Sequence, residues 1–313
     1  MPAWKILIAD GLHKNGKALL AAAAEVVDQP GISPDELPRE IGAYEALIVR
    51  SRTKVTAAVL DAAGRLKVIG RAGVGVDNID LAAASRRGVI VVNAPQSTTL
   101  AVAEQTMALM LALARQVPHA DAAMKTGQWL KKELLGVELS GKVLGIIGVG
   151  NIGAKVAQLA AAFGMSVLGY DPLLPQEVIH QRGAEAMSLQ ELYARSDMIS
   201  LHLPLTPETR GLLSGQSFGQ MKRGVRLVCT ARGGIIDETA LLGALESGQV
   251  AGAALDVFAK EPPGLTALVA HPNVIATPHI SAQTVEAQVR AAEDIACEVL
   301  AALRGESLRW KVV

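Results

Sequence analysis

Aromatic residues are scarce in this sequence, and it has no net charge. Trp, Tyr and Phe occur three times each and make up 3% of 313 residues, which leaves no stacking platform for single-stranded nucleic acid. Thirty lysines and arginines balance thirty aspartates and glutamates, so the net charge of +0 does not suggest a nucleic-acid-binding tail. With 50% hydrophobic and 19% charged residues, the composition does not suggest a disordered chain either.

Cysteines and long apolar runs are also few. Cys229 and Cys297 lie far apart in apolar contexts, so we expect buried free thiols and a reducing compartment. The longest apolar stretch, TMALMLALA, is shorter than the roughly 20 residues that a membrane span needs. The beginning, MPAWKILIAD, lacks the cleavage-like segment of a signal peptide. We therefore expect a soluble, cytoplasmic protein, and we expect no metal.

Short apolar runs alternate with alanine-rich helical segments in two series. The first series contains KILIAD, EALIVRS, LKVIGRAG and GVIVVNAP. The second begins at KVLGIIGVG and continues through MSVLGYD, DMISLHLP, GVRLVCTARGG, AGAALDV and NVIATPHI. Nearly continuous apolar strands are typical of parallel sheets that helices cover on both faces. The sequence therefore predicts an α/β protein with two doubly wound parallel-sheet domains.

The segment joining the two series begins with STTLAVAEQTMALMLALARQ and reads as a long helix that is apolar on most faces. Such a helix must be extensively buried. Two arrangements satisfy this: a helix that links the domains and packs in a dimer interface, or burial inside one chain. The last segment, TVEAQVRAAEDIACEVLAALRG, is amphipathic, and Gly305 is a plausible stop for this second helix.

A glycine motif follows the first strand of the second series. Gly148, Gly150 and Gly153 have the spacing G-x-G-x-x-G, between the apolar run 143–147 and a helical stretch over 152–163. In this context the glycines give a tight turn, close approach to a pyrophosphate and close helix–strand packing. The next strand ends in Asp171, where a carboxylate would bind the adenosine ribose and repel a 2′-phosphate. The motif therefore predicts a bound dinucleotide, NAD rather than NADP.

Several polar side chains are expected at the carboxyl ends of the strands, where open α/β sheets bind ligands. Arg232 offers two-pronged hydrogen bonds to a carboxylate, and the glycines at 233 and 234 would let the backbone pass close to substrate and nicotinamide. His279 is the candidate acid–base, with Glu261 as its carboxylate neighbour. The alternatives are a surface arginine, a loop histidine and a solvated turn residue. His202 is expected to line the cofactor pocket.

The motifs RAGVGVDNIDLAAA, GIIGVGNIG, GYDP, TARGGIIDE, ALDVFAKEPP and TPHISAQT resemble those of the D-2-hydroxyacid dehydrogenase family. The resemblance covers the chain from its first strand to about Val313. It implies a flavodoxin-like substrate-binding domain made of residues 1–94 and 283–313, with an NAD-binding Rossmann domain of residues 95–282 inserted into it. It also implies a homodimer or homotetramer and, in this short form, no regulatory C-terminal domains.

The resemblance further implies roles for individual residues. The catalytic arginine, glutamate and histidine fall on Arg232, Glu261 and His279. The implied cofactor contacts are Val74, Gly148, Gly150, Asn151, Ile152, Gly153, Asp171, His202, Leu203, Thr230, Ala231, Asp256, Ser281 and Ala282. The substrate contacts expected from the resemblance together with the residues at the strand ends are Arg50, Ser51, Arg71, Gly73, Val74, Arg232 and His279.

Additional cations indicate the substrate class. Arg50 and Arg71 end adjacent predicted strands, and a single carboxylate needs only one strong partner. We therefore expect a small phosphorylated 2-hydroxy acid, with 3-phosphoglycerate as the leading candidate. The resemblance implies serine biosynthesis as the context. Lys131 and Lys132 add charge from a partner subunit if the resemblance holds; otherwise they are solvated surface charge.

Two other functions remain open at this point. One is a glyoxylate or hydroxypyruvate reductase on the same scaffold. The other is an NAD(H)-sensing corepressor-like binding protein, which would need no proton-transfer pair. The chain also departs from the family pattern at Ser97 and Thr98, where a Gly-Asn pair is frequent, and at Ser281, where glycine is common.

Overall fold

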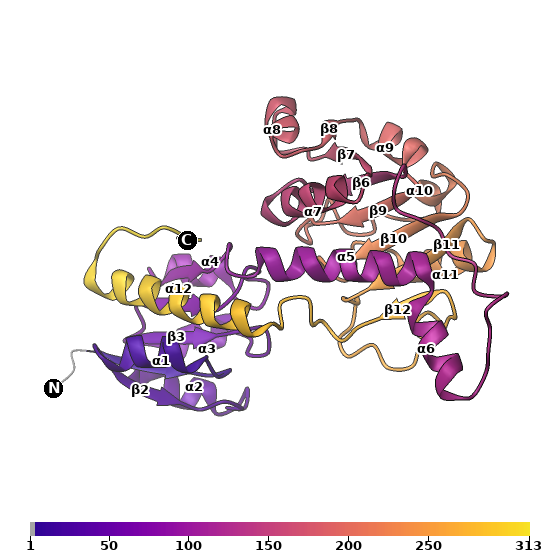
Figure 1. Ribbon diagram of the computed structural model, residues 1–313. Helices are drawn as coiled ribbons and strands as arrows, with labels where there is room; N and C mark the ends of the chain where they lie inside the picture. Colours follow the sequence, from indigo (N-terminus) through magenta and orange to yellow (C-terminus); the bar gives the residue numbers. More distant parts are fainter. Residues whose placement is uncertain (1–3) are drawn as a thin grey trace. The chain divides into compact units, whose positions relative to one another are not determined.

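The computed structural model describes residues 4–313 and divides into two compact units, each with its own parallel sheet (Figure 1). The first unit contains the chain up to Thr98 and Ala282–Val313; the second contains Thr99–Ser281. The expected boundaries were 94/95 and 282/283. The expected fold class, two doubly wound parallel α/β domains, is confirmed.

The first unit has five strands in the order β2-β1-β3-β4-β5, which is the flavodoxin-like order. Its strands are β1 (Lys5–Ile8), β2 (Glu25–Asp28), β3 (Ala46–Val49), β4 (Val68–Arg71) and β5 (Ile90–Asn93). Its helical segments are α1 (Lys14–Ala21), α2 (Leu37–Glu40), η1 (Ile41–Ala43), α3 (Ala57–Ala62), α4 (Leu81–Arg86) and α12 (Val285–Arg304).

Both faces of this sheet are buried, which explains the continuous apolar runs. Ile6, Ile8 and Ile48 belong to a cluster with Ile295 and Val299 of α12. The intervening strand residues pack into a separate cluster that contains residues of α3 and α4. Because successive side chains of a strand point to opposite faces, a sheet covered on both sides needs apolar residues at every position.

The second unit has seven strands in the order β12-β11-β10-β9-β6-β7-β8. Its strands are β6 (Val143–Ile147), β7 (Ser166–Tyr170), β8 (Glu185–Ala186), β9 (Met198–Leu201), β10 (Val225–Cys229), β11 (Val250–Leu255) and β12 (Val274–Ala276). Its helices are α5 (Thr99–Arg115), α6 (Val117–Lys125), α7 (Asn151–Ala162), α8 (Gln176–Gln181), α9 (Leu189–Arg195), α10 (Gly215–Gly219) and α11 (Glu238–Glu246).

The strand order of the second unit reverses at β6. The chain moves outward from β6 to β7 and β8, then returns to place β9 on the other side of β6. In sheets of this kind the ligand crevice opens at the carboxyl ends of the strands beside this switch point. The residues that follow β6 and β9 are therefore the ones to examine for a bound dinucleotide.

The long apolar helix expected over STTLAVAEQTMALMLALARQ is α5 (Thr99–Arg115), and a second helix, α6, follows it. Gln116 has a left-handed backbone (φ 52°) between α5 and α6, and Pro118 occupies the first turn of α6, where it cannot continue a preceding helix. Met107, Met110 and Leu113 of α5 are buried in a cluster with residues of α7 and the sheet of the same unit. Of the two arrangements expected for this helix, a dimer interface or burial inside one chain, the second therefore describes α5.

Two other expectations have clear outcomes. Helix α12 ends at Arg304, and Gly305 caps it with a left-handed backbone (φ 72°), as predicted. Both cysteines are free, but only Cys229 is buried; Cys297 is exposed on α12, so its expected burial was wrong. Among residues 4–313, no helix is long and apolar enough to cross a membrane.

Candidate active site

The glycine motif forms the turn from β6 into α7. Gly148 has a left-handed backbone (φ 94°), and a Cβ there would lie 2.6 Å from the carbonyl oxygen of His202. A Cβ on Gly153 would lie 2.1 Å from the carbonyl oxygen of Gly148, so only glycine permits this close packing. At Gly150, no atom of residues 4–313 beyond its two chain neighbours lies within 4 Å of the Cβ position. The space above Gly150 is therefore open to a ligand.

Helix α7 begins at Asn151 and Ile152, directly after Gly150. No side chain in the described part of the chain caps this end, so the backbone N–H groups of its first turn are suited to an anion. Asp171, which follows β7, accepts hydrogen bonds from the N–H of Val149 (2.9 Å) and of Leu173 (3.0 Å). The carboxylate thus supports the glycine turn and lies beside it, where a ribose would bind.

Asp171→Ala is expected to weaken NAD binding and to relax discrimination against NADP, because the charge that repels a 2′-phosphate is lost. Asp171→Asn separates the two roles, since an amide oxygen still accepts from Val149 while the charge is gone. We expect Asp171→Asn to relax discrimination with less loss of NAD affinity. Titration of both nucleotides checks this, and a wild-type protein that binds NADP as well as NAD would contradict the role of Asp171.

His202 and Leu203 follow β9 at the switch point, against Gly148. His202 Nε2 lies 2.8 Å from the hydroxyl of Ser200, while its buried Nδ1 has no hydrogen-bond partner among residues 4–313. Burial lowers the pKa of His202 to about 3, so the imidazole is neutral at physiological pH. Its position agrees with a pocket-lining residue rather than an acid–base.

Arg232 follows β10 and is half-buried, and its Nη1 donates to the carbonyl of Ala231 (2.7 Å). A Cβ on Gly233 would lie 1.9 Å from the carbonyl oxygen of Phe258, and Gly234 has a left-handed backbone (φ 83°). Close packing against the Phe258–Ala259 backbone is therefore what requires glycine at 233. The expected approach of this backbone to substrate and nicotinamide stays a prediction.

Glu261 and His279 form a hydrogen-bonded pair. Glu261 Oε1 accepts from the N–H of Phe258 (3.1 Å), and Oε2 lies 2.8 Å from His279 Nδ1. Both side chains are partly exposed, at 38% and 42%. Because Gly233 packs on the same Phe258 backbone, the Arg232 segment and this pair share one scaffold. His279 itself has a left-handed backbone (φ 53°), which is uncommon outside glycine and fixes its loop in a special shape.

Asp256 is fully buried at the end of β11 and holds the His279 loop. One carboxylate oxygen accepts from the Thr277 hydroxyl (2.6 Å) and the Ile280 N–H (2.9 Å). The other accepts from the N–H and the hydroxyl of Ser281. Four hydrogen bonds occupy the lone pairs of both oxygens. In this structure Asp256 and Ser281 thus position the loop, and a nicotinamide contact by either stays a prediction.

Asp256→Asn is expected to destabilise the protein by about 2–4 kcal/mol, because the amide NH2 would face donors that now bind a carboxylate. We also expect a lower kcat, since the loop carrying His279 loosens. Urea unfolding and steady-state kinetics check both effects. A variant with wild-type stability and turnover would show that these hydrogen bonds do not position His279.

Thr230 and Ala231 connect β10 to Arg232, and both are buried. The Thr230 hydroxyl lies 2.9 Å from the hydroxyl of Thr106 on α5, which also donates to the Val102 carbonyl. The carboxyl end of β10 is therefore fastened to α5. Sequence reasoning missed Thr106, which is 124 positions away from Thr230.

The first unit places Arg50 directly after β3, beside Arg71 at the end of β4. Asp10 organises this edge: it accepts from the N–H groups of Arg50 (2.7 Å) and Thr53 (3.1 Å), from the Thr53 hydroxyl, and from Arg52. Burial acts to raise the pKa of Asp10, but these hydrogen bonds and the Arg52 charge hold it below its ordinary value. Sequence reasoning missed Asp10, although it ends the first apolar run.

Arg71 lies over Gly73, where a Cβ would be 1.6 Å from its Nη1, and it also contacts the Ala72 carbonyl. The carbonyl of Val74 accepts from Asn93 (2.7 Å), which fixes the RAGVG turn. Ser51 is exposed beside Arg50, and the Ala282 carbonyl accepts from Gln288 of α12. The structure thus places these predicted residues in the first unit, and their ligand contacts stay predictions.

Comparison with known proteins identifies the family. Residues 107–281 match the D-isomer specific 2-hydroxyacid dehydrogenase, NAD binding domain. The chain belongs to this family. D-3-phosphoglycerate dehydrogenase from Rattus norvegicus is 50% identical over 305 residues, which are 97% of this chain and 57% of that protein. The chain thus spans little more than half the length of this dehydrogenase.

Solved structures of dehydrogenases and reductases share the whole fold. A glyoxylate reductase from Paecilomyes thermophila is 31% identical with a TM-score of 0.91, covering 100% of this chain and 99% of that chain. D-lactate dehydrogenase from Aquifex aeolicus, complexed with NAD and lactic acid, is 31% identical with a TM-score of 0.84 and 96% coverage of both chains. The family thus includes enzymes named for phosphorylated and for unphosphorylated acids.

The residues of the second unit fit NAD. The open space at Gly150, the uncapped start of α7 and the carboxylate of Asp171 match the pyrophosphate and ribose of a dinucleotide. The neutral His202, whose buried Nδ1 has no hydrogen-bond partner among the described residues, lies at the same switch point. The chain therefore carries an NAD-binding domain of this family, and its glycine turn has the close packing that the motif predicts.

Proposed function

We propose that the protein is an NAD-dependent D-2-hydroxyacid dehydrogenase acting on a phosphorylated 2-hydroxy acid, with 3-phosphoglycerate and 3-phosphohydroxypyruvate as the reactant pair. The observation that carries the proposal is the His279–Glu261 pair at 2.8 Å, on a scaffold shared with Arg232. A nucleotide sensor has no need of such a pair. The 50% identity to a phosphoglycerate dehydrogenase supports the substrate class.

The geometry of the pair defines the proton path. An ionised Glu261 can only accept hydrogen bonds, so His279 Nδ1 carries the proton between them and Nε2 is left as the base. His279 Nε2 takes the hydroxyl proton of the substrate, and Glu261 stabilises the imidazolium that forms. Bound NAD would accept a hydride from the substrate carbon that carries this hydroxyl, and that carbon becomes a carbonyl carbon. Arg232 orients the substrate by binding its carboxylate.

Two cations support a second anionic group on the substrate. Arg50 and Arg71 lie at neighbouring strand ends of the first unit, and the backbone of Arg50 is fixed by Asp10. A phosphate accepts two-pronged hydrogen bonds from guanidinium groups. Glyoxylate has a single carboxylate, which would leave Arg50 and Arg71 without a function. Arg52 forms an ion pair with Asp10, so it contributes less to binding a substrate anion than its charge suggests.

We further propose that the protein is at least a homodimer. An exposed apolar set lies on α6 and the segment after it: Val117 (52% exposed), Met124 (56%), Trp129 (73%) and Leu135 (87%). Side chains of this size gathered along one segment indicate a protein interface. Lys131 and Lys132 lie within the same exposed segment. Sedimentation at micromolar concentration is expected to give a dimer or tetramer, and a monomer would contradict the proposal.

A turnover assay tests the proposed function against a binding-only sensor. Incubation with NAD and 3-phosphoglycerate, followed by NADH absorbance, is expected to show continuous turnover. His279→Ala, with its strongly lowered turnover, serves as the control. Tight NAD(H) binding without turnover of phosphorylated or unphosphorylated 2-hydroxy acids would favour the sensor instead.

A further inference from the structure

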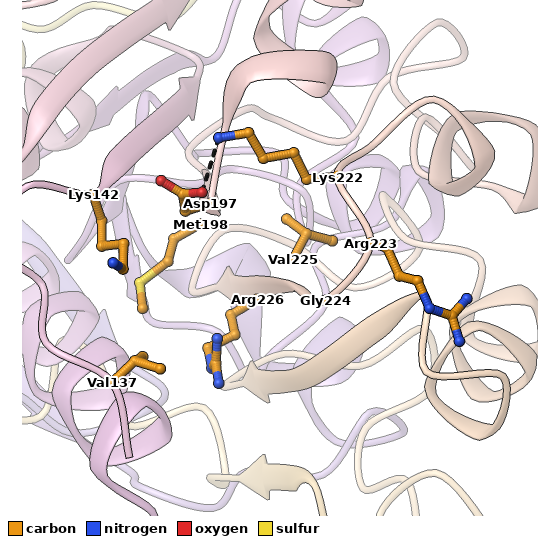
Figure 2. Close-up of a pocket in the computed structure, with 9 residues that line it drawn as sticks. All are labelled: Val137, Lys142, Asp197, Met198, Lys222, Arg223, Gly224, Val225 and Arg226. Carbon is orange, nitrogen blue, oxygen red and sulfur yellow. Dashed lines mark hydrogen bonds and ion pairs between the residues drawn. The ribbon is translucent and has the colours of Figure 1, made fainter. Parts of the chain in front are cut away.

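A cavity of about 110 Å³ opens at the amino ends of β9 and β10 in the second unit (Figure 2). This edge of the sheet is opposite to the one that carries Gly148, His202 and Arg232, because all strands of the sheet are parallel. Its charged lining consists of four cations and one carboxylate: Lys142, Lys222, Arg223, Arg226 and Asp197. The cavity therefore carries an excess of positive charge.

The carboxylate neutralises only one of these cations. Asp197 accepts from Lys222 Nζ (2.9 Å) and from the Val143 N–H (2.8 Å). Burial acts to raise the pKa of Asp197, but these hydrogen bonds and the charges of Lys222 and Lys142 hold it below its ordinary value, so it stays ionised. Arg223 donates to the Ser247 carbonyl (2.8 Å) and points away from the other lining residues in Figure 2.

Lys142 and Arg226 are the cations that remain. Within residues 4–313, neither side chain makes a hydrogen bond or a close ion pair, although the charge of Lys142 acts on Asp197. Arg226 is half-buried, and this burial lowers its pKa because no carboxylate compensates. A partly desolvated guanidinium without an anion is unfavourable, and a bound anion would remove that penalty. The volume is several times the 10–15 Å³ or so that one water needs, which limits a ligand to a few non-hydrogen atoms.

We propose that this cavity binds a phosphate group, either free orthophosphate or the phosphate of a small monoester. Arg226 supplies a planar fork of donors and Lys142 a point charge, with the Lys222–Asp197 pair at the rim. With Arg223 turned away, Lys142, Lys222 and Arg226 face one carboxylate, Asp197, and the resulting excess of two positive charges matches the double negative charge of phosphate better than that of a single carboxylate. The site lies away from the dinucleotide turn, so phosphate bound there leaves NAD binding possible.

Isothermal titration with inorganic phosphate at fixed ionic strength tests the proposal. Wild-type protein is expected to bind phosphate saturably, and Arg226→Gln and Lys142→Gln are each expected to weaken it at least about tenfold, as for loss of a charged hydrogen bond. Arg195→Gln is the matched control, because Arg195 is an exposed arginine of the same unit outside the cavity. Its affinity should equal that of the wild type.

A second variant separates this cavity from the proposed substrate site. Phosphate binding is expected to persist in Arg50→Ala, since Arg50 lies in the other unit. Parallel titrations with glycerol 3-phosphate and with orthophosphate show whether the cavity binds a phosphate monoester or free phosphate more tightly. Absence of saturable binding, equal affinity in Arg226→Gln, or loss in Arg50→Ala alone would overturn the proposal. So would an oligomeric state changed in Arg226→Gln with phosphate affinity unaltered, because a carboxylate of a second copy would then be the occupant.

Discussion

His279→Ala is expected to lower kcat by about 10²–10⁴-fold, the usual range for losing a general acid–base. The reason is the geometry of the pair: Nδ1 is fixed on Glu261, so Nε2 is the nitrogen available to take the substrate proton. His180→Ala is the matched control, because His180 is exposed on α8 and touches none of the proposed machinery. A His279→Ala variant with turnover within a factor of a few of wild type would remove the acid–base assignment.

The pH dependence tests the role of Glu261 separately. In Glu261→Gln the negative charge that stabilises the imidazolium is lost. The pH–rate limb assigned to His279 is therefore expected to move to lower pH, while an amide oxygen at 261 keeps a hydrogen bond to Nδ1. If the limb stays where it is in the wild type, Glu261 orients His279 without changing its pKa.

Arg50→Ala is expected to raise the KM for 3-phosphoglycerate, or for phosphohydroxypyruvate in the reverse direction, by about ten- to a hundredfold. Charged hydrogen bonds are worth roughly 1.5–3 kcal/mol, which gives this range. The KM for glyoxylate should change far less, because that acid has no phosphate. Arg39→Ala is the control, since Arg39 is an exposed arginine of α2 in the same unit. Equal effects on both substrates would show that Arg50 does not bind the phosphate.

Much of the architecture was predictable because periodicity and glycine spacing are local properties. The run 143–147 is β6 as predicted, and the glycine turn has the steric reasons expected from its motif. Strand β2 was missed because EVVD is short and follows an alanine-rich segment that reads as helix. Strand β8 has only two residues, too few to show a strand pattern in the sequence. Both lie at sheet edges, where few apolar residues are needed.

The contacts that organise the candidate site were harder to predict, since they join residues far apart in sequence. That Asp256 binds four donors of the 277–281 loop, and that Gly233 packs on Phe258, follow from the fold and not from any local pattern. The same holds for Arg182, whose Nη1 donates to the carbonyl of Val149 in the glycine turn (2.5 Å). Residue types in the sequence predicted that Glu261 and His279 lie side by side, but not which residues hold them in place.

The central claim is a dehydrogenase for phosphorylated 2-hydroxy acids. The most direct test compares kcat/KM with NADH for phosphohydroxypyruvate, hydroxypyruvate and glyoxylate under the same conditions. We predict that phosphohydroxypyruvate is preferred by at least about tenfold, as one lost charged interaction would give. Equal or higher kcat/KM for glyoxylate or hydroxypyruvate would contradict the claim and identify a reductase of unphosphorylated acids.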